Sequence, residues 1–264
     1  MTAVTSHQQS TGILEARIHR PATVDEAVRT LHEHPHAQYV AGATWLMRSP
    51  LRHESVAGDL ILLSGIAGLR DIEPGDPVTF GSMVTLERAA RAVTGMADLT
   101  ALHEACRAAA TPALRRMITL GGSVSATAFH ASDIVPALLC LDAEVVADRG
   151  LVTRIRLPRS SRVSCHERLT WRSGGEYSIA TVSISMDRTT QDCRVAVGSV
   201  ESAPRRWASV ERELSGRDFT PREAADVVRD HLSELSPVPA PGIPAAYRLD
   251  VLPTVMERAV GRLP

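Results

Sequence analysis

Short apolar runs separated by amphipathic stretches characterise the first 158 residues of the chain. Runs with the length and composition of buried strands occur at residues 39–41, 60–63, 78–80 and 143–146. Helices are expected over residues 24–32, from residue 86 onward and over residues 99–110. Thr23 and Thr85 stand where a hydroxyl can cap the first turn of two of these helices. This alternation predicts a mixed α/β domain that ends near Pro158.

A second unit, of α+β character, is expected from residue 159 to residue 264. Residues 176–186 alternate in polarity, which predicts a strand with one apolar face formed by Ala180, Val182, Ile184 and Met186. A partner strand is expected over residues 194–200, and helices over residues 206–214, 221–231 and 245–260. Thr220 and Pro221 combine a capping residue with proline at the first helical position. The predicted domains are therefore residues 1–158 and 159–264.

Two stretches of small residues in the first domain each follow an apolar run. Residues 41–46 read AGATWL, and Gly121 and Gly122 lie within the sequence TLGGS. Paired glycines permit a sharp turn and let another molecule approach the main chain. Successive N–H groups in such a turn suit a phosphate. The alternative is that the glycine pair is only a tight turn.

The charge balance and the titratable residues exclude several classes of function. With 29 basic and 30 acidic residues the net charge is −1, so no nucleic-acid or anionic-membrane partner is expected. Four widely spaced cysteines without a CxxC pair argue against a zinc ribbon or an iron–sulfur cluster within this chain, and buried free thiols are expected instead. No apolar run approaches the roughly 18 residues of a membrane-spanning helix, and a cytoplasmic location is expected.

A cluster of histidines at residues 32–36 invites a metal interpretation. Pro35 breaks the helix there, so His32 and His36 do not lie on one helical face with an i, i+4 spacing. A solvated helix end is the expectation, and no metal site is predicted.

The order and spacing of several motifs resemble the FAD-binding subunit or domain of the molybdenum hydroxylases, the xanthine dehydrogenase and carbon monoxide dehydrogenase group. That family carries an AGGT-x-L-like loop, then a TLGGN-like loop about eighty residues later, a small-residue run with an Asp, and PALLALDAEV. The corresponding stretches here are AGATWL, TLGGS, ASD and PALLCLDAEV, with intermediate matches at residues 60–66 and 80–86. The resemblance covers most of the chain.

The resemblance implies an α+β fold. Its first part would be a two-part FAD-binding domain of the PCMH type, similar to vanillyl-alcohol oxidase and built of two α/β lobes. A smaller α+β domain with an antiparallel sheet and helices would follow. The cofactor-binding residues that it implies are Ala41, Gly42, Ala43, Thr44, Trp45, Leu46, Thr119, Gly121, Gly122, Ser123, Asp133 and Val152.

Asp133 matches a family Asp that lies close to the flavin, although its type and position also suit an N-cap for the helix that follows. His130, three residues earlier, either pairs with Asp133 or satisfies a local hydrogen bond. No catalytic residue is assigned. FAD is expected to bind non-covalently, because neither small-residue loop contains a His or a Cys.

Several positions depart from the family pattern. Ala43 replaces the usual second glycine and is expected to fit if its φ is negative. Trp45 is expected either to pack on the cofactor or to fill the core, and Ser123 replaces the usual Asn. The family also carries an extra segment of roughly two dozen residues between the DAEV strand and the strand that reads LVTRIRLP here. In this chain residues 148–150 connect the two strands almost directly. Its later Lys and Arg have no clear counterparts between residues 168 and 178.

The function implied by the resemblance is that of an FAD-dependent oxidoreductase subunit. It would pass electrons from iron–sulfur clusters of a partner, which works with a molybdenum-cofactor subunit, through FAD to a small-molecule acceptor. A stand-alone flavoenzyme that reuses the fold and a scaffold that has lost FAD are the alternatives. The sequence identifies neither substrate nor acceptor.

Overall fold

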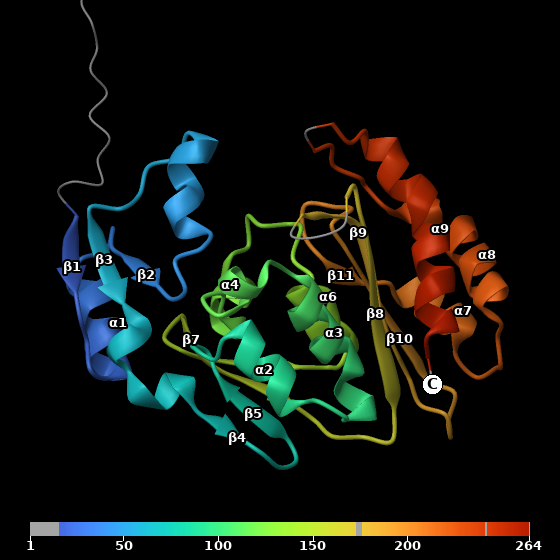
Figure 1. Ribbon diagram of the computed structural model, residues 1–264, viewed down its shortest axis with the longest axis horizontal. Helices are drawn as coiled ribbons and strands as arrows, with labels where there is room; N and C mark the ends of the chain where they lie inside the picture. The colour runs from blue at the N-terminus through green and yellow to red at the C-terminus, as the bar shows by residue number, and fades with distance from the viewer. Residues whose placement is uncertain (1–15, 173–175, 241, 264) are drawn as a thin grey trace, which may run out of the picture.

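The computed structural model describes residues 16–172, 176–240 and 242–263, and all structural statements refer to these residues. They form three sheets (Figure 1). In Figure 1 the N-terminal sheet lies at one end of the view, the helices α2 to α6 lie in the middle, and α7 to α9 lie at the other end. None of the helices in this part of the chain combines the length and the apolar character required to cross a membrane.

The first sheet is parallel, with the strand order β1-β3-β2. Its strands are β1 (Arg17–His19), β2 (Gln38–Val40) and β3 (Asp59–Leu62). Helix α1 (Val24–Glu33) packs on this sheet through buried Ala27, which shares a small core with Ile61. The predicted cap is confirmed, because the Thr23 hydroxyl accepts from the Glu26 N–H at 3.1 Å. Residues 41–45 connect β2 to the 3-10 helix η1 (Leu46–Arg52).

The second sheet is antiparallel, with the order β4-β5-β7-β6. Its strands are β4 (Ile72–Glu73), β5 (Val78–Gly81), β6 (Glu144–Asp148) and β7 (Leu151–Leu157). Only Arg149 and Gly150 separate β6 from β7, and both have positive φ, 46° and 87°. Positive φ at both central residues defines the tight two-residue turn that suits a hairpin. The short middle segment seen in the sequence is therefore a compact hairpin.

Helices cover this sheet and form the largest core with it. They are α2 (Leu86–Ala92), α3 (Thr100–Ala108), α4 (Pro112–Arg115), α5 (Leu120–Ser125) and α6 (Ile134–Cys140). Short 3-10 turns lie at η2 (Leu63–Gly65), η3 (Ala67–Arg70) and η4 (Ala97–Leu99). Thr85 caps α2, as the sequence predicts. Leu120 at the start of α5 is fully buried in the same core as Leu102 and Ile155, which anchors the second small-residue stretch to the sheet.

The third sheet is antiparallel, with the order β11-β10-β9-β8. Its strands are β8 (Val163–Thr170), β9 (Ser178–Met186), β10 (Cys193–Gly198) and β11 (Arg205–Arg206). Helices α7 (Ala208–Leu214), α8 (Pro221–His231) and α9 (Ala245–Gly261), with the turn η5 (Leu232–Glu234), follow it in sequence. The capping box predicted at Thr220 is present, with Pro221 in the first turn of α8. The chain therefore ends in an α+β unit with an antiparallel sheet, as expected.

Strand β9 is buried on both faces rather than on one. Ala180, Val182 and Ile184 pack into a core with α7, α8 and α9, as the alternation predicts, whereas Met186 is only partly buried. The opposite face carries Ser183 and Ser185, which are also fully buried. Helix α6 packs against β9 and β10, and α3 packs against β8. The first half of the chain therefore covers this face, and hydroxyls can be buried there because they find hydrogen-bond partners.

Candidate functional site

The two small-residue stretches lie against each other. A Cβ placed on Gly42 would come within 1.9 Å of the Met117 carbonyl oxygen, so the main chains are in direct contact. A Cβ on Gly122 would lie 3.6 Å from the Cβ of Ala41. Segments about eighty residues apart therefore form one surface, with residues 41–46 on one side and the start of α5 on the other.

The backbone of residues 43–45 forms a turn with unpaired N–H groups. The Ala43 carbonyl accepts from the Met47 N–H at 2.9 Å. Among the described residues, the N–H groups of Ala43, Thr44 and Trp45 have no acceptor. Ala43 has φ 59°, in the left-handed region, and Trp45 is right-handed with φ −90°. Unpaired backbone N–H groups in a turn of this kind are the donors that an anion-binding concavity uses.

The condition under which alanine was expected to fit, a negative φ at Ala43, is therefore not met. The left-handed conformation is one that glycine adopts without cost, whereas an L-residue such as alanine is strained there. We infer that the contact of Gly42 with the main chain of Met117 fixes the path of the loop and imposes this conformation on Ala43.

The second stretch is helical, and the interpretation of Gly121 and Gly122 as a tight turn was wrong. Both glycines lie in the first turn of α5, and neither has positive φ. Thr119 is the N-cap, and its hydroxyl accepts from the Gly122 N–H at 3.1 Å. The Ser123 hydroxyl donates to the Thr119 carbonyl at 3.0 Å. The capping interaction satisfies a donor that a phosphate would otherwise use.

The remaining N–H groups at the start of α5 are also used within the protein. The Leu120 N–H donates to Val84 and the Gly121 N–H to Ser82, each at 2.9 Å. A Cβ on Gly121 would lie 2.5 Å from that of Ser82, so glycine permits this close packing. The second stretch therefore supplies a wall against the first loop, and the unpaired donors belong to residues 43–45.

Asp133 lies in a buried polar network between the two halves of the chain. It is 3% exposed, and its carboxylate accepts from the Ser178 hydroxyl at 2.8 Å and from Arg168 at 3.0 Å. The ring of His166, 2% exposed, lies 3.4 Å from the same carboxylate and 2.8 Å from the Ser183 hydroxyl. The Asp133 carboxylate and the His166 ring thus have the partners that burial demands, whereas the Nε atom of Arg168 is buried without one.

Asp133 stands at the N-cap position of α6, as one of its two interpretations proposed, but its side chain does not cap the helix. Asp133 has helical φ and ψ and makes no capping hydrogen bond, while the hydroxyl of Ser132 accepts from the Val135 N–H at 3.3 Å. The His130 side chain does not pair with the Asp133 carboxylate. The backbone carbonyl of His130 accepts a hydrogen bond from the Ser199 N–H at 3.3 Å. Burial, followed by the charge of Arg248, lowers the pKa of His130.

An aromatic cluster, formed by Trp45, Phe129 and Tyr177, joins three segments beside this surface. The rings of Trp45 and Phe129 are 4.7 Å apart, and those of Phe129 and Tyr177 are 5.1 Å apart. The guanidinium of Arg52 lies 3.8 Å from the centre of the Trp45 ring, and Arg48 donates to the Tyr177 hydroxyl. Trp45 is partly exposed, so the alternative in which it fills the core was wrong.

Phe129 and Tyr177 escaped the sequence reasoning because their neighbours are distant along the chain. The available signal was scarcity, since the chain has only three residues each of Phe, Trp and Tyr. One of each type meets in the aromatic cluster. Val152 lies in β7 and packs, partly buried, against the core that contains Leu120.

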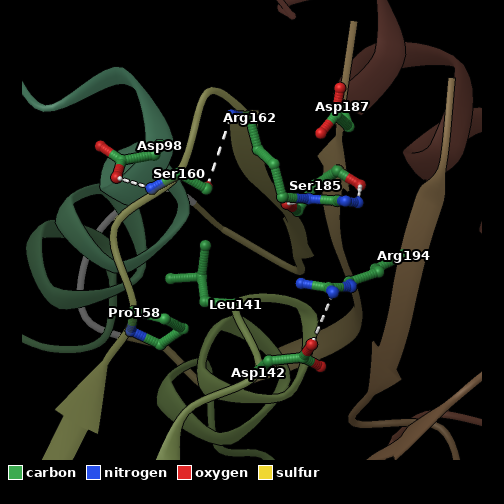
Figure 2. Close-up of a pocket in the computed structure, with 9 residues that line it drawn as sticks. All are labelled: Asp98, Leu141, Asp142, Pro158, Ser160, Arg162, Ser185, Asp187 and Arg194. Atoms are coloured by element: carbon green, nitrogen blue, oxygen red, sulfur yellow. Dashed lines mark hydrogen bonds and ion pairs between the residues drawn. The ribbon is translucent and has the colours of Figure 1, made fainter. Parts of the chain in front are cut away.

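Figure 2 shows a separate cavity of about 250 Å³. It lies between the end of α6 and the third sheet, and none of the cofactor residues expected from the sequence lines it. Arg194 pairs with Asp142 at 2.7 Å, and Arg162 donates to the Ser185 hydroxyl at 2.8 Å. Because these charged groups are already paired, the described residues that line the cavity offer no free cation to an anionic cofactor.

Comparisons with known proteins show the family to which the chain belongs. The family model described as the FAD binding domain in molybdopterin dehydrogenase matches residues 14–159, and that of the CO dehydrogenase flavoprotein C-terminal domain matches residues 168–263. The first match spans more than half of the chain, which therefore belongs to the family of FAD-binding domains of molybdopterin dehydrogenases. The resemblance seen in the sequence is confirmed, and FAD is the cofactor of the family.

Similar proteins include subunits of known oxidoreductases. The nicotine 6-hydroxylase medium subunit of Paenarthrobacter nicotinovorans is 26% identical over 270 residues, which cover 91% of this chain and 94% of that subunit. A xanthine dehydrogenase FAD-binding subunit of Escherichia coli is 29% identical over 141 residues, or 52% of this chain and 48% of that one. These relatives support the expected class, an FAD-dependent oxidoreductase subunit.

Solved structures share the fold. Carbon monoxide dehydrogenase from Hydrogenophaga pseudoflava matches with a TM-score of 0.84 and 23% identity, over 94% of this chain and 97% of that chain. Quinoline 2-oxidoreductase from Pseudomonas putida matches with a TM-score of 0.79 and 18% identity, over 94% and 96%. A two-part FAD-binding domain followed by a C-terminal domain, as predicted, is therefore the architecture of this chain.

Proposed function

We propose that this chain is the flavoprotein subunit of a molybdenum-hydroxylase-type complex. It would receive electrons from the iron–sulfur clusters of a partner subunit and deliver them through FAD to a small-molecule acceptor. A further subunit would hold the molybdenum cofactor. The observation that carries the proposal is the set of unpaired N–H groups at residues 43–45, packed against α5 in a chain of this family.

The residues present fit a dinucleotide cofactor at its diphosphate. The N–H groups of Ala43, Thr44 and Trp45 would hold the diphosphate, because convergent backbone donors neutralise an anion without a compulsory cation. Gly42 lets this loop approach the main chain at Met117, and Thr119 holds the start of α5 in place. No residue on the second stretch needs to donate for this arrangement to bind.

FAD supplies the capacity to accept and release electrons singly or in pairs, which a protein side chain does not. The chain would bind, orient and shield it. The aromatic cluster bridges the first loop and the segment before β9, and its apolar rings would exclude water beside the cofactor. Arg168 and Ser178 fix the carboxylate of Asp133 between the two halves, which would hold the cofactor surface rigid.

The clusters are assigned to a partner because, among the described residues, no cysteine belongs to a group of potential metal ligands. All four are buried and free, as the sequence predicts. Burial raises the pKa of the Cys165 thiol to about 12, which disfavours the thiolate that ligates iron. Free thiols also agree with a reducing compartment, and we place the complex in the cytoplasm.

Absorbance of the purified protein tests the cofactor assignment. We expect a flavin spectrum whose chromophore is released into the supernatant on acid precipitation, because binding is non-covalent. Yellow colour retained in the pellet would contradict non-covalent binding, and protein purified without flavin that does not take up added FAD would contradict the cofactor assignment.

Co-purification tests the place of the chain in a complex. A subunit should recover iron–sulfur and molybdenum-containing partners when expressed in its native context. The short turn at Arg149 and Gly150 favours the alternative of a stand-alone flavoenzyme. Without the longer family segment, the flavin would be open to a small substrate. A flavin-loaded protein that purifies alone and oxidises a substrate by itself would establish that stand-alone enzyme instead.

A further inference from the structure

Three potential metal ligands converge at the edge of the first sheet, away from the residues assigned to FAD. His19 ends β1, His34 follows α1 as its C-cap, and Asp59 opens β3. One ligand atom from each residue lies within 4.8 Å of the other two. The His19 Nε2 atom is 2.8 Å from the Asp59 carboxylate, and the two imidazole rings are 4.7 Å apart.

The separation of the first two ligands suits a shared metal ion. Zinc binds imidazole nitrogen and carboxylate oxygen at about 2.0–2.2 Å, so two ligands on one ion lie roughly 3 Å apart. The 2.8 Å between His19 and Asp59 is close to that value. His34 completes the set by a side-chain rotation, because all three residues are partly exposed and none is locked in the core.

The donor set selects the kind of ion. Two imidazoles with one carboxylate suit zinc and its neighbours in the transition series, whereas magnesium and calcium prefer oxygen ligands alone.

Arg17 competes only weakly with a metal ion for the Asp59 carboxylate. Arg17 reaches Asp59 at 3.9 Å with a side chain that is 69% exposed, and an exposed ion pair of this kind contributes little. His32 and His36 are exposed, as expected for a helix end, while His34 is partly buried against the sheet.

We propose that His19, His34 and Asp59 bind one divalent transition-metal ion, with zinc as the preferred metal. The ion would join the end of α1 to the starting edge of the sheet, where it would stabilise the lobe that delivers residues 41–46. Water would complete the coordination, because the part of the chain that the structure describes places no fourth His, Cys, Asp or Glu in this group.

Calorimetric titration with ZnCl₂ tests the proposal, using the full chain without a histidine tag after treatment with a chelator. We expect one zinc ion per chain in the wild type and no comparable binding of MgCl₂. His34→Ala and Asp59→Asn should each weaken zinc binding at least tenfold. His36→Ala is the matched control, since it removes an exposed histidine two residues away and should leave binding unchanged.

His19→Gln separates metal binding from simple hydrogen bonding. Glutamine keeps a donor that can reach Asp59 but removes the imidazole ligand, so zinc binding should fall while the melting temperature without zinc changes little. Zinc should raise the melting temperature of the wild type and of His36→Ala only. A wild type that binds no zinc, or a His34→Ala variant that binds it as tightly as His36→Ala, would overturn the proposal. The FAD content of every variant should match the wild type.

Discussion

Replacing Gly42 by alanine should disturb both the fold and the cofactor surface. A Cβ at this position would lie 1.9 Å from the carbonyl oxygen of Met117 and 3.3 Å from the Cα of Ile118. These atoms belong to the backbone, so no side-chain rotation relieves the clash. Because Gly42 does not have positive φ, alanine is conformationally allowed, and only the contact changes.

The magnitude follows from the displacement. Real Cβ atoms stay at least 3.0 Å from such neighbours, so residues 41–46 must move away from Met117 by about the difference, more than 1 Å. Overpacking of this kind costs about 1–3 kcal/mol. For a chain of this size each kcal/mol lowers the melting temperature by about 2–4 °C, so Gly42→Ala should melt about 2–12 °C below the wild type.

Cofactor binding should weaken in the same variant. Loss of two hydrogen bonds to a charged phosphate costs about 3 kcal/mol, or roughly a hundredfold in FAD affinity. Melting temperature and FAD affinity should be measured on the same sample. Gly68→Ala is the control, because no atom lies within 4 Å of its Cβ position, and it should match the wild type in both. Gly42→Ala with unchanged stability would refute the packing argument, and reduced stability with unchanged FAD affinity would refute the site.

Two further predictions concern a helix cap and a pH-dependent ion pair. Thr119→Ala removes the acceptor for the Gly122 N–H and should lower the free energy of unfolding by about 1 kcal/mol. Thr119→Ser keeps a hydroxyl and should retain most of that stability. Equal denaturant midpoints for the two variants would contradict this. Hydrogen bonds to Glu213 and Glu234 raise the pKa of His231, so its stabilisation is complete below the pKa of the unfolded chain and is lost as the pH rises through the folded value. The melting temperature of wild type minus that of His231→Gln should therefore be positive near pH 5.5 and vanish by pH 8.5, and a difference that grows with pH would show the reasoning to be wrong.

Local signals in the sequence were sufficient for much of the fold. The caps at Thr23, Thr85 and Thr220 depend on a hydroxyl and an N–H only three residues away, so a short window contains both partners. The direct passage from β6 to β7 was also visible as a missing segment. In the structure a two-residue turn at Arg149 and Gly150 connects the two strands in place of that segment.

Long-range contacts decided the positions where the sequence misled. Gly121 and Gly122 suggested a turn, but they lie in a helix, where the Gly121 N–H donates to the carbonyl of Ser82, far earlier in the chain, and glycine permits close packing on that residue. Asp133 suggested a cap, yet its partners come from strands more than 30 residues further along the chain. Such contacts depend on how sheets and helices pack in the tertiary structure, and a local sequence pattern does not predict that packing.

The domain boundary near residue 158 remains a prediction, and truncation at Arg159 tests it. If residues 1–158 are an independent domain, the shortened chain should still unfold cooperatively. The structure shows what that fragment would lose, because α3 and α6 pack against the third sheet. A fragment without ordered tertiary structure would contradict the boundary.

Because β9 is buried on both faces, both halves of the chain pack against this strand. Unfolding of α7, α8 and α9 would strip the face of Val182 and Ile184, while unfolding of α3 and α6 would strip the face of Ser183 and Ser185. Neither half can open widely without uncovering the middle of the sheet. The amide hydrogens of β9 should therefore be among the last to exchange with solvent, and exchange at the two ends of the molecule should converge on one common opening event.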